Sequence, residues 1–335
     1  NKKKIILAKR TRVTCRQIYV FQFAKKIGIK NCDHLIKHGA DFLFDKLLNE
    51  KDMFIYSYSE IKNKSNFNCY LYEQAFALLA LAYIYKNLPI YTSKSIYQAE
   101  KLIKSIINHW GIDLRSIQDA GKKSIYSDPY MHLLESLLIW RKIANDENKN
   151  FFNIVSITDD FINFILKYLI NNDRTVITES YIVKSNNIIP NTNSHVEPGH
   201  QYEWASLLLE WNKHSKNDNI YKLASKMIRN NEIKSINPRS KHIINKSNFK
   251  LVATDRKSKL WPQTERVKAL IYLLKYEKDI IVNLNQSLNS LVKYIGKPIK
   301  IGWVEEFDDF GKLQKSNFKA SSLYHIASAI ESIVE

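Results

Sequence analysis

The chain has 335 residues, 45% of them hydrophobic and 12% aromatic, so it can bury a sizeable core in one or two domains. No apolar run approaches the roughly 20 residues of a membrane span, and only 8 glycines argue against a β-rich fold. The net charge of +18 raises a nucleic-acid hypothesis, but the lysines are scattered, so we expect no nucleic-acid or membrane partner. Cys15, Cys32 and Cys69 lack zinc spacing and an even count, which favours a reduced, cytoplasmic setting. We expect a monomer or a homodimer.

Apolar periodicity predicts a series of helices along the chain. They cover 11–27, 32–48, 70–87, 93–109, 129–144, 152–171, 201–214, 218–231, 264–276, 279–294 and 321–334. Short connections within pairs alternate with long connections between pairs, which indicates an internal repeat of helical hairpins. Two of the long connections contain strand-like pieces, at 54–58 and 301–304.

The first helix of each pair is apolar on all sides, best seen at 75–82, whereas the second is amphipathic, as at 93–109. The sequence therefore predicts an inner and an outer ring, an all-α (α/α)6 barrel in which 1–335 form a single domain. By this count the first outer helix is missing ahead of residue 1. An open helical solenoid shows the same alternation and is the alternative.

The stretch 197–204 contains the most informative group of polar residues. Pro198 and Gly199 interrupt the backbone before an apolar run, which places His200 in the first turn of a helix. Glu203 follows on the same helical face. The helix dipole favours a neutral imidazole at this position, and a histidine beside a carboxylate can transfer protons.

Polar and aromatic residues also begin the other inner helices. They are Arg16; Tyr72 and Glu73; Tyr130, Met131, His132 and Glu135; Trp261, Gln263 and Glu265; and Tyr324 and His325. Parallel inner helices would bring all six starts to one mouth, so we expect a shared functional site there. Trp261, and Trp303 in the last long loop, offer flat faces to the C–H groups of a sugar.

Three other interpretations of this mouth are less favoured. A metal site is disfavoured because the histidines lie on separate helices without an HExxH motif. A glycosidase needs two carboxyl groups as acid and base, whereas histidines dominate here. A helical scaffold or nucleic-acid binder would place basic residues along one face.

These motifs resemble the N-acylglucosamine 2-epimerase superfamily over nearly the whole chain, and in order and spacing they are most similar to its bacterial mannose isomerase branch. The matching stretches are 12–19, 72–78, 128–135, 197–204, 260–265 and 324–326. The resemblance implies an (α/α)6 barrel and an isomerisation or C2 epimerisation without metal or cofactor. The sugar ring would open, C2 would lose its proton, and a cis-enediol would form.

The resemblance also implies catalytic roles. His325 matches the general base that takes the C2 proton, and His200 matches the histidine of ring opening or of proton delivery to the other face. Glu203 would orient His200 or hold a hydroxyl, His132 would contact substrate oxygens, and Arg16 would stabilise the enediolate oxygen. The expected substrate-binding residues are Tyr72, Met131, Trp261, Gln263, Glu265 and Trp303.

The predicted reaction is the interconversion of D-mannose and D-fructose. One alternative is a sugar 2-epimerase of the N-acylglucosamine, mannose/glucose or cellobiose type. Another is an isomerase of a phosphorylated sugar such as mannose 6-phosphate. A 1,2-isomerase moves a proton along one face, whereas a 2-epimerase needs groups on both faces of C2. Because both histidines are present, the sequence leaves this choice open.

Overall fold

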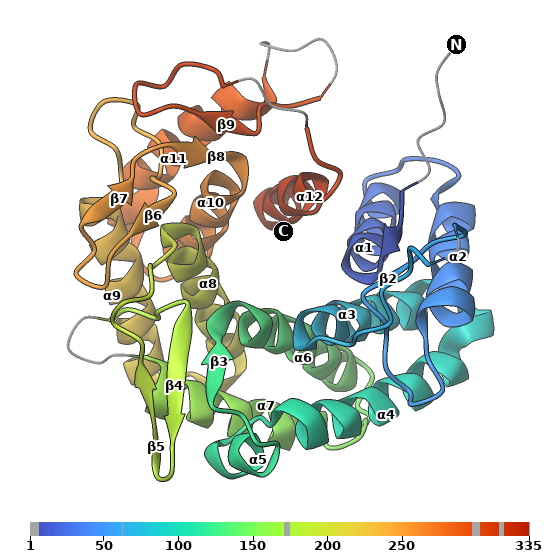
Figure 1. Ribbon diagram of the computed structural model, residues 1–335. Helices are drawn as coiled ribbons and strands as arrows, with labels where there is room; N and C mark the ends of the chain where they lie inside the picture. The colour runs from blue at the N-terminus through green and yellow to red at the C-terminus, as the bar shows by residue number, and fades with distance from the viewer. Residues whose placement is uncertain (1–6, 62, 171–174, 297–301, 315–317, 335) are drawn as a thin grey trace. The chain divides into compact units, whose positions relative to one another are not determined.

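The computed structural model describes residues 7–61, 63–170, 175–296, 302–314 and 318–334 (Figure 1). The chain forms two compact units. Unit 1 comprises Asn1–Lys122 and His132–Phe164, and unit 2 comprises Lys123–Met131 and Ile165–Glu335.

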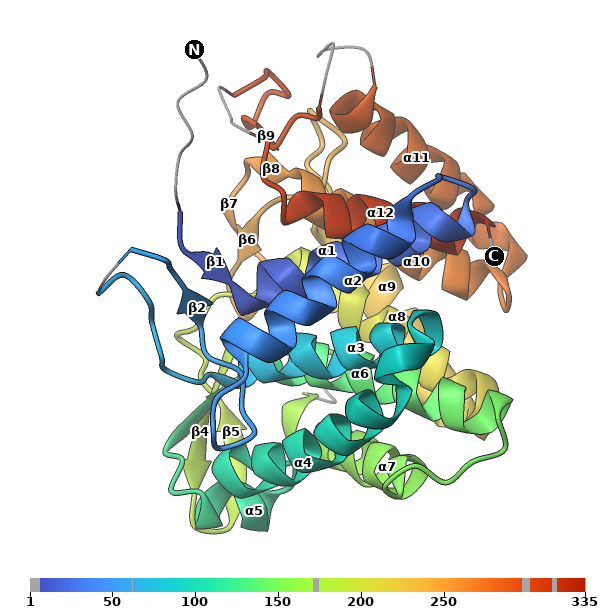
Figure 2. The same cartoon turned by 90° about the vertical axis from the view of Figure 1, so that its right-hand side faces the viewer.

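Unit 1 is built from helical hairpins, and Figure 2 shows α1 (Thr11–Lys26) beside α2 (Cys32–Phe42). Helix α3 (Leu71–Asn87) packs on α1 and on α4 (Thr92–Trp110). An ion pair between Arg141 and Asp159 joins α6 (Ser127–Asp146), which begins in unit 2, to α7 (Ile154–Phe164). Strands β1 (Lys9–Arg10) and β2 (Ser57–Tyr58) pair antiparallel. Unit 1 therefore has the predicted paired helices.

Unit 2 repeats this helical packing. Helix α8 (Pro198–Ser215) packs on α9 (Asp218–Lys234) and on α10 (Leu260–Leu274), which also contacts α11 (Ile281–Ile295) and α12 (Ser322–Val334). An antiparallel sheet is formed by β3 (Ser124–Tyr126), β4 (Ser180–Lys184) and β5 (Asn187–Pro190). The remaining pairs are β6 (Lys246–Ser247) with β7 (Ala253–Asp255), and β8 (Ser258–Lys259) with β9 (Glu306–Phe307).

Every helix predicted from the sequence is present, with ends shifted by a few residues. Two predicted helices end in a π-helical turn, at Leu43–Leu47 and at Ile165–Leu169. The sequence analysis missed α5 (Leu114–Asp119), a short helix that begins with a capping box formed by Asp113 and Ser116. Among the residues that the structure describes, no helix is long and apolar enough to cross a bilayer.

The strand predictions are only partly confirmed. The piece at 54–58 contains β2, but 302–304 are not a strand, and residue 301 lies outside the described residues. The pairing strand there is β9, which begins two residues later and uses its backbone groups to bind β8. The prediction from hydrophobic residues at 301–304 was therefore misplaced, because the position of a strand depends on which backbone segment it can pair with.

The fourth residue is a glutamine in three of the buried helices, α3, α8 and α10. Each side-chain amide accepts the N–H and binds the C=O of a single residue in the preceding connection, 20 or 24 positions earlier. The pairs are Gln74 with Phe54, Gln201 with Ile177, and Gln263 with Ile243. These glutamine clamps satisfy buried backbone groups and fix each connection to the start of the helix that follows it.

Candidate active site

His200 lies in the first turn of α8, as predicted, although the helix begins earlier, at Pro198. Proline fits this first position because it has no N–H to leave unpaired. The imidazole Nδ1 of His200 is 2.9 Å from Oε2 of Glu179, and its Nε2 is 3.7 Å from Oδ1 of Asp128. The sequence analysis assigned no role to either carboxylate.

The charge state of His200 differs from the sequence-based expectation. Burial alone lowers the pKa of His200, but the charge and hydrogen bond of Glu179, together with Asp128 and Glu197, raise it well above its usual range. The prediction of a neutral imidazole was therefore wrong, because close carboxylates outweigh the partial charge of a helix end. The raised pKa favours the protonated form of His200.

Glu179 is fixed by several contacts that converge just before β4. Its Oε1 accepts the backbone N–H of Glu197, the residue that precedes α8, at 3.1 Å. Its own carbonyl accepts the N–H of Ser127 at the start of α6. The Gln201 clamp holds Ile177 two residues upstream. Glu179 therefore orients His200, a role that the sequence analysis offered to Glu203.

His325 lies in the first turn of α12 and binds a different carboxylate. Its Nδ1 is 2.8 Å from Oε1 of Glu265 on α10, and Oε2 of Glu265 is 2.8 Å from Nζ of Lys268. Burial alone raises the pKa of Glu265, but Lys268 and then His325 lower it to about 2. The ionised Glu265 can accept the Nδ1–H of His325, which leaves Nε2 as the basic nitrogen.

The indole of Trp261 contacts both histidines. Its ring centroid is 4.9 Å from that of His200 and 5.8 Å from that of His325, so the imidazoles are no farther apart than the sum of these distances. Gly199 allows this approach, because a Cβ at that position would lie 2.4 Å from the indole. Unit 2 therefore brings together three of the predicted site residues.

Glu305 attaches the last loop to the start of α12. Its carboxylate accepts the indole N–H of Trp303 at 2.6 Å, the backbone N–H of Lys319 at 2.7 Å and the hydroxyl of Ser322 at 2.9 Å. Trp303 also packs against Phe318. The predicted stacking of Trp303 on a sugar stays a prediction.

In unit 1, Arg16, Tyr72 and His132 form a hydrogen-bonded chain. Arg16 donates from Nη2 to the Tyr72 hydroxyl at 3.1 Å, and that oxygen is 3.3 Å from Nε2 of His132. Nδ1 of His132 is 3.0 Å from Glu135. These contacts suit a Tyr72 hydroxyl that donates to a neutral His132, whose Nδ1–H donates to Glu135.

Aromatic faces support this chain. The guanidinium of Arg16 lies 4.4 Å from the ring centroid of Phe76, and that of Arg12 lies 5.0 Å from the ring of Tyr72. Phe76 also packs against His132 at 4.5 Å between centroids. Arg16 and His132 are both buried. The aromatic rings and the Tyr72 hydroxyl therefore fix the positions of these two polar side chains within unit 1.

Two of the residues predicted to bind sugar, Gln263 and Met131, make structural contacts in this fold, and their contact with a sugar stays a prediction. Both ends of the Gln263 amide bind backbone groups, mainly those of Ile243, and the side chain is buried. Met131 is fully buried in the core. Glu203 is also buried, and its possible contact with a substrate hydroxyl stays a prediction, as does the meeting of all six helix starts in one site.

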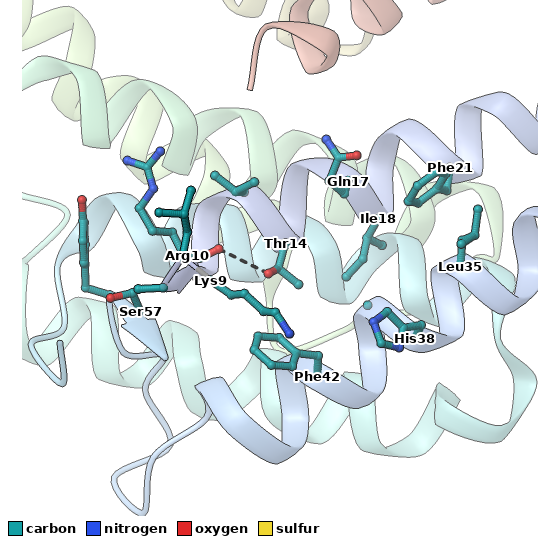
Figure 3. A pocket seen from close by; sticks show the side chains of 15 residues that line it. Lys9, Arg10, Thr14, Gln17, Ile18, Phe21, Leu35, His38, Phe42 and Ser57 are labelled. Carbon is teal, nitrogen blue, oxygen red and sulfur yellow. Dashed lines mark hydrogen bonds between the residues drawn. The ribbon is translucent and has the colours of Figure 1, made fainter. Parts of the chain in front are cut away.

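A separate cavity of about 690 Å³ lies in unit 1 between α1 and α2 (Figure 3). Its walls are mostly apolar and include Ile18, Phe21, Leu35 and Phe42, with His38 as a polar member. The predicted site residues do not line this cavity. It is therefore a different feature from the histidine clusters.

The histidine clusters also bear on metal binding. In His132, His200 and His325 alike, Nδ1 faces a carboxylate. The same pairing supports ligating histidines in metal centres, where the other nitrogen binds the ion. The expectation of a metal-free and cofactor-free reaction therefore needs a direct test.

Comparison with known proteins places these clusters in context. The model of the family described as N-acylglucosamine 2-epimerase (GlcNAc 2-epimerase) matches residues 2–329. A protein of Rhizobium meliloti (strain 1021) named mannose-6-phosphate isomerase is 24% identical over 334 residues, which cover 96% of this chain and 84% of the relative.

Solved structures show the same fold. A D-mannose isomerase superposes with a TM-score of 0.82 at 16% identity, covering 98% of this chain and 88% of the other. The cellobiose 2-epimerase of Bacillus thermoamylovorans B4167 gives a TM-score of 0.81 at 15% identity with the same coverage. The predicted fold class, an all-α (α/α)6 barrel, is confirmed.

Proposed function

We propose that the chain interconverts D-mannose and D-fructose. It belongs to the N-acylglucosamine 2-epimerase family and is therefore a sugar isomerase or epimerase. The observation that carries this proposal is the arrangement of His200 and His325 around the indole of Trp261. Carboxylates raise the pKa of His200, and His325 pairs Nδ1 with the ionised carboxylate of Glu265. Such a pair suits proton transfer on an aldose.

In the proposed reaction His200 first serves as the acid. The imidazolium gives a proton to the ring oxygen O5 as the C1–O5 bond breaks, and the hydroxyl on C1 loses its proton to form the aldehyde. His325 then removes the proton on C2 through Nε2. The electron pair of that C–H bond forms the C1=C2 double bond, and O1 takes up a proton to give the cis-enediol.

Ketose formation completes the proposed sequence. The proton returns to C1, the hydroxyl on C2 loses its proton, and the carbonyl of fructose forms at C2, so that no oxidant or reductant is consumed. Trp261 would cover an apolar face of the sugar. From unit 1 we keep Arg16 as the residue that stabilises the enediolate, with Tyr72 and His132 as partners of sugar oxygens.

Two alternatives remain within this family. A 2-epimerase would return the proton to the opposite face of C2, a role open to His200 because it is protonated. The name of the Rhizobium meliloti relative favours a phosphorylated substrate as a second candidate. Arg12 and Arg16, which lie over aromatic rings in unit 1, could attract such an anion.

Proton NMR of sugars incubated with the enzyme in D2O tests the proposal. Mannose should yield fructose with deuterium at C1, whereas glucose deuterated at C2 would identify an epimerase. Parallel reactions with mannose 6-phosphate and N-acetylmannosamine define the substrate class. If none of these sugars is converted or exchanges its C2 proton, the mannose-centred proposal is wrong.

The absence of a metal requirement is a proposal of its own. Dialysis against EDTA and 1,10-phenanthroline should leave turnover within twofold of the untreated enzyme, with a metal-dependent isomerase as the positive control. Loss of activity that Zn²⁺ or Mn²⁺ restores would contradict it. We also keep as predictions a single functional domain, a cytoplasmic location and a monomer or homodimer, of which the last is checked by gel filtration.

A further inference from the structure

We propose that Glu179 and Lys268 are positioning residues that hold the two histidines beside Trp261 in different protonation states, His200 protonated and His325 neutral. Neither residue was assigned a role from the sequence. Each acts through a histidine rather than by touching the sugar. The charged groups around His200 differ from those around His325, and this difference makes one histidine a proton donor and the other a proton acceptor. The inference rests on the proposed function but concerns charge states that exist without substrate.

Carboxylates surround His200. Glu179 binds Nδ1 at 2.9 Å, and Asp128 faces Nε2 at 3.7 Å from the start of α6. Glu197, at the start of α8, adds a third negative charge nearby, and its own carboxylate binds His195 at 3.2 Å. The groups that face His200 from α6, α8 and the segment before β4 are therefore acidic, while α10 contributes the neutral Trp261. A proton on the imidazole of His200 offsets part of this negative charge.

His325 pairs with a carboxylate that it shares with a lysine. Glu265 is completely buried and lies between Nδ1 of His325 and Nζ of Lys268, each at 2.8 Å. Lys268 is itself largely buried, one helical turn after Glu265 on α10. Because Lys268 already balances the charge of Glu265, the group is neutral when His325 is neutral.

The mechanistic consequence is a division of labour fixed before substrate binds. A neutral His325 can accept the C2 proton, and a protonated His200 can donate to the sugar oxygen. Without Lys268, the unbalanced Glu265 would favour protonation of His325 and remove the base. Without the Glu179 charge, His200 would lose its proton more readily and the acid would be depleted at neutral pH.

The test follows both imidazoles by NMR in the free enzyme, with ring-labelled histidine and assignment by His200→Asn and His325→Asn. In the wild type, His200 should stay protonated at a pH where His325 is neutral. Glu179→Gln should move the titration of His200 down by at least one pH unit. Glu197→Gln is the matched control, because its carboxylate binds His195, and it should cause a smaller shift.

Lys268→Met should move the titration of His325 upward, and this shift should disappear when Glu265→Gln is added. Lys275→Met, at the end of the same helix, is the control and should have no effect. Folding of each variant is checked by circular dichroism, and Glu179→Asp should restore the charge of His200 if Glu179→Gln loses the fold.

Unchanged titrations in folded Glu179→Gln and Lys268→Met would overturn the inference. This result can be told apart from failure of the proposed function, because the titrations need no turnover. With active enzyme, the same variants should narrow the pH profile of kcat/KM. Glu179→Gln should move its alkaline limb to lower pH, and Lys268→Met should move its acidic limb to higher pH.

Discussion

The two compact units hold their candidate site residues by different means. In unit 2, His200 and His325 each bind a carboxylate through Nδ1, and both contact one indole. In unit 1, His132 also pairs Nδ1 with a carboxylate, that of Glu135, but its Nε2 faces the Tyr72 hydroxyl that binds Arg16, and both Arg16 and His132 pack on the ring of Phe76. Carboxylates set proton affinity, whereas rings and hydroxyls set position. This difference is the basis for the proposed division of roles, in which unit 2 moves protons and unit 1 binds sugar oxygens.

The largest expected effect on kcat comes from removing the negative charge of Glu265, the carboxylate that binds His325. Glu265→Gln should lower kcat by about 10²–10⁴-fold, the usual contribution of general acid–base catalysis, with little change in KM. Steady-state kinetics with mannose measure it, and Glu306→Gln on β9 is the control. A change in KM without a fall in kcat would contradict the assignment of proton transfer to unit 2.

A smaller loss is expected from Gly199→Ala. The new Cβ would meet the indole of Trp261 at 2.4 Å, so the ring that contacts both histidines must move. We expect kcat/KM to fall about tenfold and the free energy of unfolding to fall by about 1–3 kcal/mol, as in other overpacked sites. Tryptophan fluorescence and urea unfolding report the two effects. Unaltered fluorescence and kinetics would show that the indole position is unimportant.

Tyr72→Phe probes unit 1. The ring contacts with Arg12 and Phe76 remain, but the hydroxyl that links Arg16 to His132 is lost. The lost hydrogen bond is worth about 0.5–1.5 kcal/mol, so KM should rise by up to about tenfold while kcat changes less. If kcat falls and KM does not, unit 1 takes part in proton transfer and the comparison fails.

The smallest kinetic effect is expected from Gln263→Leu. The variant leaves the N–H and C=O of Ile243 without their side-chain partner, and each buried group left unpaired costs about 1–3 kcal/mol. Stability measured by urea unfolding should drop, whereas KM for mannose in the folded variant should stay within twofold. A large rise in KM would restore Gln263 as a sugar contact.

The fold was largely predictable because the helices are long and their apolar patterns are regular. Residues 75–82 identified a helix buried on all sides, and α3 is buried there. Most of the short strands and α5 were missed, because they depend on backbone pairing and on a local cap rather than on a repeating pattern.

The placement of His132, His200 and His325 in the first turns of helices was predictable from the sequence, whereas their catalytic roles stay a prediction. Glu179 was not, because it lies 21 positions from His200 in an irregular segment, and only the fold brings the two together. Lys268 could have been found, since it lies three positions after Glu265 on one helix face. The backbone bonds of Gln263 were not predictable, because a motif does not show whether an amide faces a ligand or a backbone.

The glutamine clamps have a consequence for the dynamics of the connecting segments. Phe54, Ile177 and Ile243 lie outside the long helices, where amide protons usually exchange quickly with solvent. Their N–H groups are nevertheless bonded to buried glutamines. Exchange at these three amides requires each helix start to open as well, so protection against deuterium should extend from the helices into the segments that precede them.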